Sequence, residues 1–229
     1  MEFEISGPQG FSKLDVSFNE GERLFAQPRA MMTMTTGFEI GSQLGGVSSG
    51  SPILGGVKSM LSGENFAIAT YKAKRNGERL SLAPANLGEI RIIDVCEGSS
   101  YFLARGAYLA HESSIIIQPR FAGLKGWMSK KGLFLLHVSG TGKVCISSHG
   151  AIVERELADG ELLVVDNDYV VAFSDTLQYE LRTATASVKD SVLSGEGLVN
   201  RYQGPGRLLY QTRSRQRSGF LSSLLAVAS

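Results

Sequence analysis

The feature that most constrains this chain is a segment that occurs three times. The copies read GERLFAQPRAMMTM from Gly21, GSSYFLARGAYLAH from Gly98 and GELLVVDNDYVVAF from Gly160, and they align without gaps. Their starting numbers give the offsets 98 − 21 = 77 and 160 − 98 = 62. Each copy reads as a turn glycine, a strand, a polar break and a second strand. The repetition predicts a fold built from one recurring unit.

A shorter element, a glycine followed by an apolar strand, recurs between these copies. It reads GERLSL from Gly77, GKVCIS from Gly142 and GRLLYQ from Gly206, with the offsets 142 − 77 = 65 and 206 − 142 = 64. The apolar positions of the first copy are slipped by one residue. Because the chain starts with one half of a repeat and ends with the other half, we expect its ends to pair and close a ring without exposed sheet edges.

The composition favours a soluble all-β protein. The chain has 229 residues with 27 glycines and 6 prolines, and short apolar runs such as Leu14, Val16 and Phe18 alternate with polar residues. We expect one compact domain of three repeated β units and a short C-terminal helix. The units cover approximately residues 1–62 plus 195–217, 63–125 and 126–194, and the tail covers 218–229.

Cysteine content and the ends of the chain indicate a cytoplasmic protein. Cys96 and Cys145 are too few for a disulfide framework, and their apolar, strand-like surroundings predict buried thiols. The first residues, MEFEISGPQGF, lack the apolar core of a secretory signal. No apolar stretch approaches the roughly 20 residues of a membrane-spanning helix.

The segments above resemble the altered inheritance of mitochondria (Aim twenty-four) family. The resemblance is carried by GERLFAQPRAMM, GGVKSMLSGENF, LAPANLGEIRIIDV, ARGAYLAH, GTGKVCISSHGAIV, LLVVDNDYVVAF and GPGRLLYQTRS. It implies a fold like that of the trp RNA-binding attenuation protein (TRAP), repeated in one chain as three pseudo-symmetric β-sandwich units of the double-stranded β-helix type. It implies no catalytic activity, because none is established for the family. Mitochondrial members are associated with inner-membrane organisation, which we do not transfer to this chain.

Glycine-rich stretches that look like phosphate loops fail the test of spacing. SGTGKV covers residues 139–144, and a P-loop there would need glycine at position 137 and a metal-binding hydroxyl at position 144. These positions hold His137 and Val144. SGSPILGGVKS from Ser49 has Val57 before its lysine. We expect turn and linker roles for both stretches.

Histidines and carboxylates give no local catalytic or metal motif. His111, His137 and His149 are too widely spaced for one, although the fold could still assemble a site from them. We expect hydrogen-bonded or exposed histidines. Asp166 and Asp168 could work as an acid–base pair, but their place between two strands favours turn roles. We therefore expect no catalytic residue, no metal and no cofactor.

The most informative charges are arginines near the C-terminus. The candidate anion-binding residues are Arg207, Arg213, Arg215 and Arg217. If the last strand continues through TRSRQR, alternation places the final three on one side, where they could hold phosphates of RNA or of an anionic lipid. A solvated tail is the simpler interpretation. A formal net charge of +1 argues against bulk electrostatic capture of nucleic acid.

These observations favour a non-enzymatic β-scaffold that acts in protein interaction or assembly, as a homo-oligomer or with a protein partner. The first alternative is an RNA or anionic-ligand binder that uses the C-terminal arginines. The second is an enzyme whose site is assembled between units. The 218–229 tail could lie on a membrane surface, but we expect it to pack on its own chain or on a neighbouring subunit.

Overall fold

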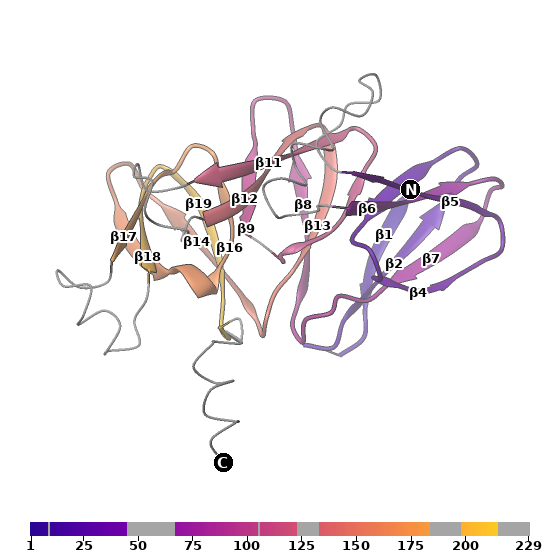
Figure 1. Ribbon diagram of the computed structural model, residues 1–229, viewed down its shortest axis with the longest axis horizontal. Helices are drawn as coiled ribbons and strands as arrows, with labels where there is room; N and C mark the ends of the chain where they lie inside the picture. The colour runs from indigo at the N-terminus through magenta and orange to yellow at the C-terminus, as the bar shows by residue number, and fades with distance from the viewer. Residues whose placement is uncertain (9, 45–66, 105, 123–132, 184–197, 215–229) are drawn as a thin grey trace, which may run out of the picture.

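The described part of the chain is all-β, as the sequence predicts. The computed structural model describes residues 1–8, 10–44, 67–104, 106–122, 133–183 and 198–214 (Figure 1). These residues form nineteen strands and one 3-10 helix, Asn167–Tyr169, and the strands make four sheets. The predicted C-terminal helix at 218–229 lies outside the described residues.

Two smaller sheets lie at opposite ends of the longest axis of the molecule (Figure 1). The first contains, in order, β1 (Glu2–Ser6), β2 (Lys13–Phe18), β7 (Glu78–Leu82) and β4 (Met31–Met34). The second contains β15 (Leu162–Asp166), β18 (Leu198–Gln203) and β17 (Gln178–Thr183). Among the described strands, β4 and β15 therefore each have a partner on one side only.

Two six-stranded sheets lie between these ends. One has the order β5 (Phe38–Leu44), β6 (Ala67–Ala73), β3 (Arg23–Ala26), β10 (Tyr108–Glu112), β13 (Gly142–Ser147) and β8 (Ile90–Val95). The other has the order β11 (Ile115–Ala122), β12 (Leu133–Gly140), β9 (Tyr101–Ala104), β16 (Val170–Ser174), β19 (Gly206–Gln211) and β14 (Ile152–Leu157).

The same strand pairings recur along the chain. We call β2 to β7 unit 1, β8 to β13 unit 2 and β14 to β19 unit 3. In each unit the first, sixth and third strands pair in that order, and so do the fourth, fifth and second. Each pair of three-stranded arrays contributes to one apolar core, which includes Leu80 in unit 1, Val144 in unit 2 and Leu208 in unit 3. The likeness to TRAP stays a prediction.

The chain does not close on itself in the way that the sequence suggested. The strand that begins at Gly206, β19, pairs with β14 and β16 rather than with the N-terminal strands. The glycine strand is thus the last strand of its own unit, and residues 198–211 group with 152–183 instead of with 1–62. In each unit the last residue of the first strand lies opposite the first residue of the sixth strand, which is Glu78, Gly142 or Gly206. The equivalent of Gly142 and Gly206 in unit 1 is therefore Glu78 rather than Gly77, and the two offsets between sixth strands are equal (142 − 78 = 64 and 206 − 142 = 64).

Aromatic packing holds the core of unit 3. The side chain of Phe173 is completely buried. Its ring centroid lies 5.3 Å from Phe102, 5.0 Å from Tyr179 and 5.1 Å from Tyr202. Since such pairs add to the free energy gained by burying apolar area, this cluster should dominate the stability of unit 3.

Replacing Phe173→Ala should lower the free energy of unfolding by about 3 to 5 kcal/mol, because it leaves a cavity among three rings. Phe11, whose side chain is 69% exposed, provides the matched control. Phe11→Ala should change the free energy by less than about 0.5 kcal/mol. Urea unfolding followed by circular dichroism measures both, and similar losses in the two variants would contradict this packing.

Candidate functional site: the junctions between units

Neighbouring units are joined by strand pairing in one register. At the first junction β3 of unit 1 pairs with β10 of unit 2, and His111 lies opposite Phe25. At the second junction β9 of unit 2 pairs with β16 of unit 3, and Phe173 lies opposite Phe102. The two pairs are related by the repeat offsets found in the sequence, since 102 − 25 = 77 and 173 − 111 = 62. Their ring centroids lie 4.9 Å and 5.3 Å apart, so the same cross-strand position carries a ring contact at both junctions.

The third strand of every unit also ends in the same polar contact. A side-chain oxygen at its end accepts a hydrogen bond from a backbone N–H near the start of the sixth strand. The pairs are Thr35 with Arg79 at 3.0 Å, Glu112 with Lys143 at 2.7 Å and Ser174 with Arg207 at 2.9 Å. The register between third and sixth strands shifts once in each unit, at Met31/Thr33, Tyr108/Ala110 and Val170/Ala172.

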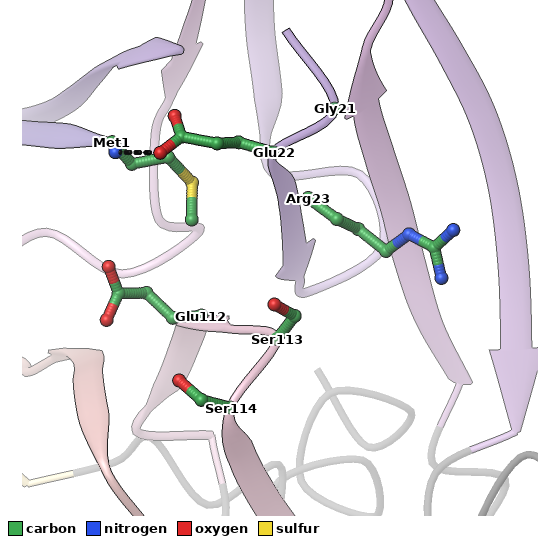
Figure 2. Close-up of a pocket in the computed structure, with 7 residues that line it drawn as sticks. All are labelled: Met1, Gly21, Glu22, Arg23, Glu112, Ser113 and Ser114. Carbon is green, nitrogen blue, oxygen red and sulfur yellow. Dashed lines mark hydrogen bonds and ion pairs between the residues drawn. The ribbon is translucent and has the colours of Figure 1, made fainter. Parts of the chain in front are cut away.

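A shallow pocket of about 400 Å³ lies at the first junction (Figure 2). Its lining residues are Met1, Gly21, Glu22, Arg23, Glu112, Ser113 and Ser114. The carboxylate of Glu22 binds the terminal ammonium of Met1 and accepts a hydrogen bond of 2.8 Å from the backbone of Asn19. Burial raises the pKa of Glu22. The hydrogen bonds from Met1 and Asn19 lower this pKa by more, so it lies below its usual value.

The charged side chains of this pocket do not converge on a common point. Glu112 is engaged by the backbone N–H of Lys143. Figure 2 shows the Arg23 guanidinium pointing away from both Glu22 and Glu112. Both carboxylates of the pocket are thus bound to other groups of the chain.

An equivalent pocket of about 410 Å³ lies at the second junction. Its lining residues are Cys96, Glu97, Gly98, Ser99, Ser100, Ser139, Gly140, Thr141 and Asp175. The hydroxyl of Ser100 donates to Asp175, and Nε2 of His137 lies 3.1 Å from the same hydroxyl oxygen. In a nucleophilic triad the histidine lies between serine and carboxylate and takes the serine proton. Here serine occupies the middle place, so the geometry does not activate its hydroxyl through histidine.

The two best-placed histidines serve the packing of the junctions. The ring of His111 is buried, stacks on Phe25 and bonds through Nδ1 to the hydroxyl of Tyr108 at 2.7 Å. Burial lowers the pKa of His111 to about 3, so the ring is neutral at physiological pH. Burial and the nearby Arg120 also lower the pKa of His137, which Asp175 partly offsets. Among the described residues no group of three or more His, Cys, Asp or Glu side chains could hold a metal ion.

The turn residues behave largely as predicted. Gly140 and Gly142 have positive φ angles of 105° and 145° at the turn between β12 and β13, in the SGTGKV stretch. Asp166 accepts a hydrogen bond of 2.8 Å from the backbone of Asp168 and caps the 3-10 helix. The SGSPILGGVKS stretch lies outside the described residues. The prediction of a buried Cys96 is wrong, because this residue follows the end of β8 and is exposed in a turn.

The predicted arginine stripe is not formed by the residues that can be located. The strand β19 ends at Gln211, so strand alternation does not reach Arg213. Arg207 is paired with Glu154 at 3.0 Å and with Glu156 at 3.6 Å. Arg215 and Arg217 lie outside the described residues. The charge of Arg207 is thus already matched by carboxylates.

Apolar side chains are instead exposed along the two end strands, a feature that the sequence reasoning missed. Met31, Met32 and Met34 of β4 are 37% to 49% exposed, and Leu162 and Val164 of β15 are 54% and 58% exposed. The matching third strands, β10 and β16, are buried from their first through their fourth residue. The three aligned segments could have indicated this exposure. They supply three second strands and three third strands, but two internal junctions use only two of each, so one second strand and one third strand are left without a partner unit.

No helix in the described ranges is long and apolar enough to cross a membrane.

The buried His111 should make the protein sensitive to acid. The unfolded chain takes up a proton near pH 6.5 and the native state only near pH 3, so stability falls as the pH drops between these values. Between pH 7 and pH 4.5 this group alone should remove about 2.5 kcal/mol. The double variant Tyr108→Phe/His111→Phe removes both partners of the hydrogen bond between these side chains and should lose correspondingly less stability.

Urea titrations of both proteins at the two pH values measure the difference. The carboxylates with lowered pKa values, Asp15, Glu22, Glu78 and Glu161, act in both proteins and cancel in the comparison. Equal losses in the two proteins would contradict the assignment of a neutral, buried His111.

Known proteins match this chain over nearly its whole length. An uncharacterized protein of Streptococcus pyogenes serotype M6 is 29% identical over 100% of this chain and 93% of its own length. A crystal structure of a Streptococcus pyogenes protein is similar with a TM-score of 0.77 and 26% identity, covering 99% of this chain and 97% of that one. The family model described as Mitochondrial biogenesis AIM24 matches residues 3–213. The chain therefore belongs to the Mitochondrial biogenesis AIM24 family.

Proposed function

We propose that the protein is a non-enzymatic β-scaffold that acts through protein interaction or assembly. The observation that carries this proposal is the pair of end strands, β4 and β15, which expose apolar side chains and have one described partner each. An edge strand presents a row of backbone donors and acceptors that readily pair with another chain. Apolar side chains on the same strands supply the burial that makes such pairing stable.

The polar groups at the junctions support a scaffold over the enzyme alternative. Glu22 is bound to the chain terminus, Glu112 to a backbone N–H and Ser100 to Asp175. Each of these contacts joins segments far apart in the sequence, which is a structural task. A catalytic site needs at least one nucleophile or base directed toward the substrate.

The anion-binding alternative has less support among the residues that can be located. Arg207 faces two carboxylates, and a phosphate would have to displace them. Binding to RNA or to an anionic lipid depends on several unpaired cations acting together. Edge pairing needs no such cluster.

Native mass spectrometry of the purified chain tests the proposal. One chain has a mass of 24.6 kDa, and we expect multiples of this mass or a stoichiometric protein complex. Raising the salt concentration to about 0.5 M should leave the assembly intact, because apolar contacts are not screened by salt.

Two outcomes would contradict the proposal. One is a strictly monomeric chain without a bound protein at micromolar concentration. The other is co-purifying nucleic acid whose release by salt dissolves the assembly, which would favour the anion-binding alternative.

A further inference from the structure

We propose that β15 of one chain pairs with β4 of a second copy, antiparallel and with Val164 opposite Met34. This inference rests on the proposed function and specifies its partner: the protein binds itself, head to tail, through a third junction of the kind that already joins its units. The occupant of each exposed edge is thus the opposite edge of another copy.

The register follows from the two internal junctions. Phe25 in β3 and Phe102 in β9 occupy the same place in the repeat. Adding the offset of 62 residues between the second and third copies to Phe102 gives the equivalent residue of unit 3, Val164 in β15 (102 + 62 = 164). In the third strands, Phe173 and His111 occupy the same place in the repeat. Subtracting the offset of 77 residues between the first and second copies from His111 gives the equivalent residue of unit 1, Met34 in β4 (111 − 77 = 34). Both internal pairs are in ring contact across the junction. Val164 and Met34 should therefore touch across the new one.

Burial distinguishes the paired third strands from the unpaired one. At the internal junctions His111 is 3% exposed and Phe173 is fully buried, whereas Met34 is 37% exposed. Apart from pairing across a junction, β4 has the same neighbour relations as β10 and β16, including the register shift against the sixth strand. The exposed methionines are thus the side chains that a missing second strand would cover.

The position of the two edges favours a second copy over closure within the chain. The sheet that contains β4 and the sheet that contains β15 lie at opposite ends of the longest axis of the molecule (Figure 1). At both internal junctions a second strand meets a third strand, and never a strand of its own kind. The contact between copies is accordingly heterologous, so each chain binds one copy at each end and the assembly is a ring or an open filament.

Disulfide trapping between two separately made proteins tests this register. Both carry Cys96→Ser, because Cys96 is exposed, whereas Cys145 is buried and stays. One protein carries Met34→Cys and the other carries Val164→Cys. Directly opposite residues of an antiparallel pair lie about 4.5 to 5.5 Å apart between Cα atoms, within the range that a disulfide spans. We expect oxidation to cross-link the mixture and neither protein alone.

A shifted pair provides the control for register. Met32→Cys mixed with Val164→Cys places the thiols two positions out of register, and we expect at most about one tenth of the cross-linking. Equal cross-linking of the shifted pair would overturn the proposed register. Cross-linking of Met34→Cys with itself would show that two copies of β4 pair with each other, which would overturn the head-to-tail arrangement.

A charge on the edge strand gives an independent readout. Val164→Lys should raise the dissociation constant of the assembly by about tenfold or more, because a lysine on an edge opposes strand addition. Ile116→Lys is the matched control, since Ile116 is 55% exposed on β11, the edge of another sheet. It should leave the assembly unchanged, and circular dichroism checks that both variants keep their β-structure.

The outcomes separate this inference from the proposed function. If the protein assembles but neither cross-links as expected nor responds to Val164→Lys, the head-to-tail junction is wrong and the scaffold proposal stands. If the unmodified chain is a monomer that binds no protein, both fail.

Discussion

Pairing between the second strand of one unit and the third strand of the next is the interaction on which the structure depends. A β-sandwich of six strands leaves these two strands at sheet edges, where their backbone groups lack a partner. Each internal junction turns two edges into the middle of a six-stranded sheet. The buried β10 and β16 show the result: their first four residues are buried in both strands.

The chemistry at the junctions varies while the geometry is kept. A neutral histidine stacks on Phe25 at the first junction, and a phenylalanine packs against Phe102 at the second. Position by position, the register is the same. The backbone pairing therefore stays the same while the side chains at this place differ. That tolerance is consistent with methionine and valine at a third junction.

The pockets at the two junctions follow from the same geometry. Both form where a turn before the second strand of one unit approaches the end of the third strand of the next. Their polar residues bind one another, as Ser100 does with Asp175 and Glu22 with the chain terminus. The recurrence of a pocket at each junction thus reflects the repeated backbone.

Sequence alone could predict the repeated strands, because backbone geometry fixes the residue at each turn. Gly21, Gly98 and Gly160 all adopt φ angles of 73° to 82°, a conformation that favours glycine and so preserves the alignment. The pairing of strands across units could not be predicted from the sequence. It depends on how neighbouring units are oriented, and many side-chain contacts together determine that orientation. The approach of Ser100, His137 and Asp175 was hidden for the same reason. Their three strands and turns meet only in the folded chain.

Hydrogen exchange tests the central claim most directly, because it reports on the backbone groups of the two edges. Above the assembly concentration, the amides on the open side of β4 and β15 should be protected almost as strongly as those of β10 and β16, and dilution should remove this protection from β4 and β15 alone. Fast exchange of these open-side amides at every concentration, with β10 and β16 protected throughout, would contradict pairing of these edges between copies.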